Sequence, residues 1–187
     1  MQIVDLTLQP DPIREQAAAL LVNGFREPRG WSSLPAAHDE VRRVLNEGFA
    51  YAALDGDALL GWIGGIPNPG YEGRVWELHP MVVRPEHRRR GVGRALVEAF
   101  EAEARRRGAI TATLGTDDDA GMTSLSGVDL YADIPGHIAG LRDLGKSHPF
   151  LFYRALGYVV TGIMPDANGP GRPDIYMSKP LRRSTPR

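Results

Sequence analysis

The sequence predicts one mixed α/β domain, because segments with the period of a strand alternate with segments that have the period of a helix. Phe49–Leu54 and Ala58–Ile66 have strand composition and flank Asp55-Gly56, which is a strong signal for a hairpin turn. Trp76–Gly108 reads as a buried strand, a glycine-rich turn and an amphipathic helix in direct succession. Together these observations favour a sheet covered by helices.

The helices are predicted from apolar periodicity and from the residues that start and stop them. Proline in a first turn and glycine after a last turn are typical of helix ends. The predicted helices span Asp11–Gly24, with Asp11 as the cap, Pro35–Glu47, Ala95–Ala104 with Gly108 as the stop, a short segment near His137–Leu144, and Pro149–Leu156.

The remaining strands are predicted at the two ends of the chain and after the long helix. Met1–Leu8 alternates as an edge strand does, and Ile110–Gly115 follows the stop at Gly108. Tyr158–Met164 and Ile175–Lys179 are expected to close the sheet as a pair. No internal repeat or linker interrupts this order, so we expect a single domain over residues 1–181 and a polar tail over 182–187.

Composition excludes several classes of protein. The 187 residues are 42% hydrophobic, which suits a globular chain with one substantial core. The net charge of −1 indicates neither a nucleic-acid nor a membrane partner. The absence of cysteine excludes disulfides, thiolate metal sites and a cysteine nucleophile, and no metal site is expected. The sequence shows neither the pattern of a signal peptide nor an apolar stretch long enough to span a membrane, and a cytoplasmic location is expected.

The turn between the Trp76 strand and the following helix has the features of a diphosphate site. A helix N-terminus presents unpaired N–H groups and the positive end of the helix dipole. Gly91 and Gly93 lack a Cβ and allow a diphosphate to approach the backbone, and arginines precede them. The alternative is an ordinary solvated turn.

The pattern around these glycines selects among phosphate ligands. No G-x-x-x-x-G-K-[S/T] string is present, and Leu96 stands where a dinucleotide fingerprint needs its third glycine. Arg88-Arg89-Arg90-Gly91-Val92-Gly93 has the form R-x-x-G-x-G. In this respect the chain resembles the GNAT superfamily of N-acetyltransferases, which binds acetyl-CoA at such a turn.

The resemblance narrows to aminoglycoside 6′-N-acetyltransferases and covers roughly residues 52–181. It is carried by G-W-I-G-G-I-P, W-E-L-H-P-M-V-V, L-G-T-D-D, S-G-V-D-L-Y, H-P-F-L-F-Y-R-A-L-G-Y and P-D-A-N-G-P-G-R-P-D-I-Y-M. It implies an α/β fold with a mixed, mostly antiparallel central sheet, splayed at the acetyl-CoA site and flanked by helices. It also implies the residues that would bind the cofactor: Met81, Val82, Val83, Arg88, Arg89, Arg90, Gly91, Val92, Gly93, Arg94 and Tyr153.

The resemblance further implies four catalytic positions. Glu77 would bind the reactive amine and act as base, and His79, two residues on and therefore on the same strand face, would shape that site. The backbone N–H of Met81 would polarise the thioester carbonyl. Tyr153 would protonate the departing thiolate, which suits a phenol with a pKa of about 10. The alternatives are an exposed strand face with two polar residues, and a tyrosine that belongs to the core.

The predicted substrate side is acidic. Residues 114–175 contain eight Asp, no Glu and four Lys or Arg, a balance of −4. Asp117 and Asp118, at the end of a strand, are the preferred partners for a polycationic aminosugar, while other aspartates suit turns and caps. Trp31 and Tyr71 are expected to cover a sugar face or to anchor their loops.

Two classes of function remain open on the sequence. The first is an enzyme that acetylates the 6′-amine of aminoglycosides, or another small cationic amine such as a polyamine or a peptide N-terminus. The second is a non-catalytic acyl-CoA-binding module, against which the presence of both Glu77 and Tyr153 argues. A homodimer is expected by analogy with the family.

Overall fold

The structure is a computed structural model that describes residues 1–25, 31 and 33–182. The chain divides into two compact units, Met1–Ala112 with Leu181–Arg187, and Thr113–Pro180. Each unit is described by itself, and the single domain expected over residues 1–181 stays a prediction. The predicted tail at 182–187 lies outside the described residues except for Arg182, whose Nη2 donates to the carbonyl of Arg105 at 3.3 Å.

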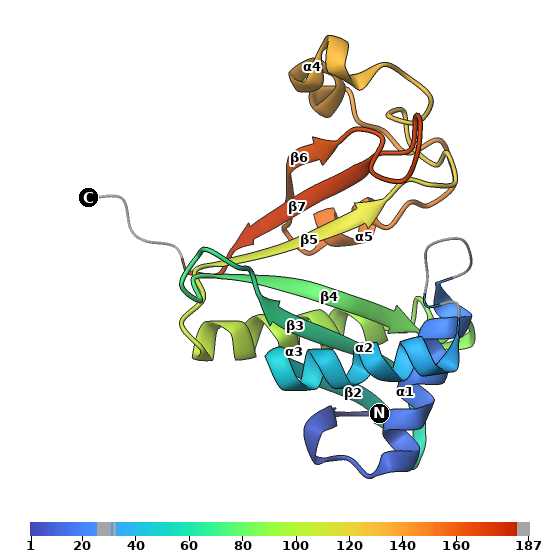
Figure 1. Cartoon of the computed structure of the whole chain (residues 1–187), viewed down its shortest axis with the longest axis vertical. Helices are drawn as coiled ribbons and strands as arrows, with labels where there is room; N and C mark the ends of the chain where they lie inside the picture. The colour runs from blue at the N-terminus through green and yellow to red at the C-terminus, as the bar shows by residue number, and fades with distance from the viewer. Residues whose placement is uncertain (26–30, 32, 183–187) are drawn as a thin grey trace. The chain divides into compact units, whose positions relative to one another are not determined.

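The first unit contains the N-terminal helices, the predicted hairpin and the strand–turn–helix segment (Figure 1). Its elements are β1 (Gln2–Asp5), α1 (Asp11–Gly24), α2 (Leu34–Glu47), β2 (Phe49–Asp55), β3 (Ala58–Pro67), β4 (Val75–Val83) and α3 (Val92–Arg106), with 3₁₀ turns at Leu6–Leu8 and Pro85–His87.

The strands of this unit lie in the order β1-β2-β3-β4, and each neighbouring pair among them is antiparallel. Asp55 pairs with Ala58 across the hairpin, where Gly56 has a φ of +57°, so the predicted Asp-Gly turn is confirmed. The predicted edge strand over residues 1–8 is too long. It ends at Asp5 because the Asp5 carboxylate accepts a hydrogen bond from the N–H of Thr7 at 2.8 Å and caps a 3₁₀ turn.

The helices α1 and α2 begin differently from each other. Ser33 caps α2, because its Oγ accepts a hydrogen bond from the N–H of Ala36 at 3.3 Å. The predicted cap of α1 is wrong by one position: Pro10 is the N-cap, without a side-chain hydrogen bond, and Asp11 lies in the first turn. There its negative charge still favours the positive end of the helix dipole.

The two faces of this sheet carry different helices. Ala50 and Ala52 belong to a buried cluster that also contains Leu21 of α1, Val44 of α2 and Trp62 of β3. Phe49, one position earlier on β2, points to the other face, where its ring lies 5.7 Å from that of Phe100 on α3. The alternation along β2 therefore places α1 and α2 on one face and α3 on the other.

Strand β4 contains a bulge at the position of His79. Ile63 pairs with Met81 and Gly65 with Leu78, so that Gly64 on β3 faces both His79 and Pro80 on β4. A Cβ on Gly64 would lie 2.4 Å from the carbonyl oxygen of His79. Glycine at this position therefore permits the close approach of the two backbones.

The second unit contains β5 (Thr111–Asp117), which begins two residues before the boundary, and the strands and short helices that follow it. These are α4 (Ile134–Ala139), α5 (Phe150–Ala155), β6 (Val159–Met164) and β7 (Asp174–Pro180), with a 3₁₀ turn at Leu130–Ala132. The strand order is β5-β7-β6, and β6 and β7 form the predicted antiparallel closing pair.

One helix of this unit is displaced from its prediction. The short helix expected near residues 137–144 spans Ile134–Ala139. The Asp133 carboxylate starts it early by accepting a hydrogen bond from the N–H of Gly136 at 3.0 Å. In neither unit is any described helix long and apolar enough to cross a membrane.

Candidate active site

The turn at Gly91 has the geometry that a diphosphate site needs. Gly91 is the N-cap of α3 with φ +87° and ψ −10°, and no side chain caps the helix. The first helical hydrogen bond runs from the N–H of Ala95 to the carbonyl of Gly91, so the N–H groups of the first turn have no partner within the helix. Exposed arginines precede this turn in the sequence, at positions 88–90, and follow it at position 94. The residues therefore fit the phosphate-bearing end of acetyl-CoA.

The other residues predicted for the cofactor differ in exposure. Arg88, Arg89, Arg90 and Arg94 are exposed, but the Nε of Arg88 already donates to the carbonyl of Val83 at 3.1 Å. The side chains of Val82, Val83 and Val92 are buried. These three valines could therefore contribute to cofactor binding only through their backbones. Met81 is half-buried, and the carbonyl-polarising role of its N–H stays a prediction.

Replacing Gly91 by Val is expected to weaken acetyl-CoA binding, because a β-branched side chain is strained at φ +87° and would cover the first turn of α3. Calorimetric titration with acetyl-CoA measures this effect. Gly108→Val is the matched control, since Gly108 follows the same helix with φ +97° and equally open space around its Cβ position. Equal affinities in the two folded variants would remove this turn from the cofactor site.

Glu77 and His79 alternate with buried neighbours along β4, and both side chains are half-buried. They share a face of the strand, as predicted from their spacing. Within the described part of the chain, the Glu77 carboxylate makes no hydrogen bond or ion pair. Among the residues that the structure describes, nothing competes for this carboxylate, whereas His79 is engaged by Glu40.

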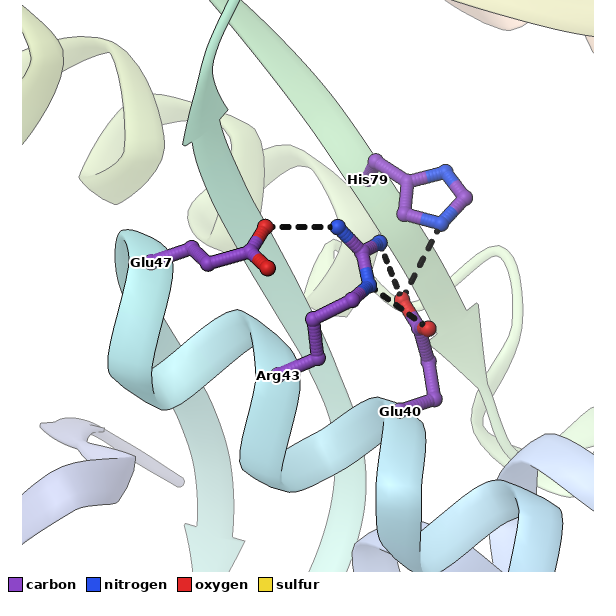
Figure 2. A network of polar contacts seen from close by, with 4 residues as sticks. All are labelled: Glu40, Arg43, Glu47 and His79. Carbon is purple, nitrogen blue, oxygen red and sulfur yellow. Dashed lines mark hydrogen bonds and ion pairs between the residues drawn. The ribbon is translucent and has the colours of Figure 1, made fainter.

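His79 is held by a polar network on α2 that the sequence did not indicate (Figure 2). Its Nε2 lies 3.2 Å from Oε1 of Glu40. Arg43 donates to the same carboxylate from Nη2 at 2.7 Å and from Nε at 3.0 Å, and its Nη1 donates to Glu47 at 2.9 Å. The spacing of Glu40, Arg43 and Glu47 predicts ion pairs within a helix, but nothing in the sequence connects them with His79.

This network keeps the Glu40 carboxylate ionised. Burial by itself raises the pKa of a carboxyl group, but the hydrogen bonds from His79 and Arg43 outweigh it and lower the pKa of Glu40 to about 2. At neutral pH the Glu40 carboxylate can therefore only accept hydrogen bonds.

Of the two aromatic residues predicted for the substrate, the structure brings one to His79. The Trp31 ring lies 5.9 Å from the imidazole of His79 and 5.2 Å from the ring of Phe25. Tyr71 is 55% exposed in the turn between β3 and β4. Trp31 thus forms one side of the candidate site, while the substrate contact of Tyr71 stays a prediction.

The two aspartates at the end of β5 have different environments. Asp118 is fully buried, and its carboxylate accepts hydrogen bonds from the N–H of Met122 at 2.5 Å and from the N–H and Oγ1 of Thr123 at 2.8 and 2.7 Å. Asp117 is exposed, and its carboxylate accepts a hydrogen bond from Nδ2 of Asn168. The buried, hydrogen-bonded carboxylate of Asp118 thus has a structural role. Of the two aspartates, only Asp117 is exposed, and it remains the predicted partner for the positive charge of the substrate.

Separate replacement of the two aspartates by Asn is expected to separate these roles. Asp117→Asn should raise KM for a polycationic acceptor and flatten its salt dependence, because it removes the exposed negative charge that is predicted to attract such an acceptor. Asp118→Asn should instead destabilise the fold, by about 1–3 kcal/mol, because a buried acceptor of three hydrogen bonds is impaired. Steady-state kinetics and thermal unfolding measure the two effects. A changed KM in a stable Asp118→Asn variant, with Asp117→Asn unaffected, would reverse the assignment.

Tyr153 lies on the buried face of α5 and is 7% exposed. Its ring contacts those of Phe152 at 5.1 Å and Tyr158 at 5.8 Å, both edge to face. Burial raises the pKa of the Tyr153 phenol, so the hydroxyl keeps its proton at neutral pH. At neutral pH the Tyr153 phenol is therefore protonated, as a proton donor must be.

The fold and these side chains define the class of protein, and the comparisons with known proteins agree. Residues 15–126, more than half of the chain, match the acetyltransferase (GNAT) family. The chain belongs to this family, as the arginine-glycine turn and the order of strands and helices predicted. The α/β fold predicted from the resemblance is confirmed, and so is its class as an acetyltransferase.

Three solved structures resemble the chain over its whole length. An aminoglycoside 6′-N-acetyltransferase crystallised with coenzyme A is 38% identical with a TM-score of 0.90, each chain covering 100% of the other. The aminoglycoside 6′-N-acetyltransferase from Enterococcus faecium is 36% identical with a TM-score of 0.88 at the same coverage. An aminoglycoside 6′-acetyltransferase type Ii is 33% identical with a TM-score of 0.74, over 99% of this chain and 100% of that one. The comparison with curated proteins gave no match.

Proposed function

We propose that the protein is an acetyl-CoA-dependent N-acetyltransferase that acetylates the 6′-amine of aminoglycosides by direct transfer. The observation that carries this proposal is the similarity, at 33–38% identity over 99–100% of the chain, to three structures of enzymes with that activity. The half-buried carboxylate of Glu77, which has no hydrogen-bond or ion-pair partner among the described residues, supports it, because a cationic amine needs such a partner. A role in antibiotic resistance, a cytoplasmic location and a homodimer belong to the same proposal.

In this mechanism, acetyl-CoA supplies an activated acetyl thioester. Gly91 and the first turn of α3 bind its phosphates through backbone N–H groups. The N–H of Met81 donates a hydrogen bond where negative charge develops on the carbonyl oxygen. Each of these groups is fixed by β4 or α3, so little reorganisation is needed during the reaction.

Different residues act on the attacking amine and on the sulfur of the thioester. Glu77 binds the ammonium group and accepts a proton from it, directly or through water, which frees the nitrogen lone pair for attack. The Tyr153 hydroxyl donates a proton to the leaving sulfur, and its burial keeps that proton in place until then. Asp117 attracts the other positive charges of the substrate.

Two alternatives remain testable. Another small cationic amine, such as a polyamine or a peptide N-terminus, would also fit the half-buried carboxylate of Glu77. A non-catalytic acyl-CoA-binding module would bind acetyl-CoA at Gly91 and transfer nothing. Release of free thiol from acetyl-CoA, measured with and without kanamycin, distinguishes the module from an enzyme that acetylates aminoglycosides.

The regiochemistry is tested with a panel of aminoglycosides that includes analogues carrying hydroxyl in place of the 6′-amine. We expect thiol release with the 6′-amino compounds and none with their 6′-hydroxy counterparts. Mass spectrometry of the product locates the acetyl group. Equal rates with both sets, or transfer to polyamines alone, would contradict the proposed substrate.

A further inference from the structure

We propose that Glu40 is a positioning residue of the acetyl-transfer site. It holds the imidazole of His79 with hydrogen on Nε2 and thereby presents Nδ1 as a second acceptor for the reacting amine beside Glu77. The substrate would then be a primary ammonium group, which can donate one N–H to Glu77 and another to His79. This inference rests on the proposed function, because it takes the reaction to occur beside Glu77.

The contact joins two distant parts of the first unit. Glu40 lies on α2 and His79 at the bulge of β4, and their side chains are 12% and 36% exposed. The distance of 3.2 Å between Nε2 and Oε1 is that of a hydrogen bond (Figure 2). Because Glu40 is the more buried partner, the carboxylate is the fixed end of the pair and the imidazole is the oriented one.

Arg43 makes the Glu40 carboxylate rigid. Its guanidinium contacts both carboxylate oxygens from the next turn of α2, and its third nitrogen is held by Glu47. Rotation of the Glu40 side chain would break two charge-assisted hydrogen bonds at once. Because the Glu40 carboxylate is held in this way, it can orient the imidazole of His79, from which it accepts a hydrogen bond.

The charge of Glu40 determines where the histidine carries its hydrogen. An ionised carboxylate only accepts, so Nε2 must be the donor, and in the neutral ring Nδ1 then has a free lone pair. In Figure 2, the other ring nitrogen lies on the side of the imidazole away from Glu40. The Trp31 ring at 5.9 Å packs beside the imidazole and restricts its rotation.

Nuclear magnetic resonance tests the protonation pattern without any aminoglycoside. The chain has five histidines, and protein labelled with ¹⁵N-histidine gives a signal pair for each, with His79 assigned by its loss in His79→Asn. We expect His79 to be the Nε2–H form when neutral in the wild type. It should become a mixture of both forms in Glu40→Leu, which keeps volume and removes the acceptor. A wild-type His79 with hydrogen on Nδ1 would overturn the proposal.

Kinetics test the consequence for the reaction. Glu40→Leu should lower kcat/KM by about 10- to 100-fold, the range that one charge-assisted hydrogen bond supports, and Glu40→Gln, which keeps an acceptor oxygen, should lose less. Asp39→Leu is the matched control, because Asp39 pairs with Arg42 at the same spacing on the same helix and not with His79. Its kcat/KM should stay within about twofold of the wild type.

A double-mutant cycle shows whether Glu40 acts through His79. In the His79→Asn background, Glu40→Leu should change kcat/KM by less than about threefold. An undiminished effect in that background would overturn the positioning role. If the wild type acetylates no aminoglycoside, the proposed function fails, but the ¹⁵N spectra still decide whether Glu40 orients His79. If Glu40→Leu does not fold, the wild-type and Glu40→Gln spectra decide the same question.

Discussion

Tyr153→Phe is expected to slow acetyl transfer by about 10²–10⁴-fold, the usual contribution of general acid catalysis. The replacement keeps the ring and its edge-to-face contacts with Phe152 and Tyr158 and removes only the hydroxyl. Because burial raises the pKa of the Tyr153 phenol, the wild-type donor is fully protonated across the neutral range. The loss should therefore not vary with pH between about 6 and 9.

The measurement for Tyr153 is the single-turnover rate of transfer to the amine, since product release limits many such enzymes and would mask the step. Tyr158→Phe is the control, because it removes a hydroxyl from a fully buried tyrosine of the same aromatic cluster. It should leave the single-turnover rate unchanged. A wild-type rate in Tyr153→Phe would show instead that this tyrosine only packs in the core.

Glu77→Gln is expected to lower kcat/KM by about 100-fold or more, because Gln neither attracts the ammonium group nor accepts its proton. Acetyl-CoA affinity should be unchanged, since the cofactor is expected to bind at Gly91.

Steady-state kinetics measure the effect of Glu77→Gln on kcat/KM, and calorimetric titration measures its acetyl-CoA affinity. Glu98→Gln is the control, because it removes one negative charge from an exposed position on α3. Its kcat/KM should match that of the wild type. If Glu77→Gln retained wild-type kcat/KM, the amine would have to be activated by another group.

Local sequence determined most of the elements near the candidate site. The Asp55-Gly56 hairpin and the helix that ends before Gly108 follow from residues in direct succession. The turn at Gly91 was predicted in the same way, because its positive φ is a property of one glycine. The predictions that missed were the end of the strand over residues 1–8, the cap at Asp11 and the helix near residues 137–144. They depended on which polar side chain reaches a backbone N–H, and several candidates stood within a few positions.

The sequence by itself determined the family, the arginine-glycine turn and the placement of Glu77 and His79 on one face of β4. These features depend on the period of a strand and on short motifs, which neighbouring residues define. The tertiary structure alone decided that Asp118 is buried while Asp117 is exposed, because burial depends on what folds over a side chain. It alone also decided that Glu40, held by Arg43, reaches His79, since a contact between a helix and a distant strand forms only when the two pack together.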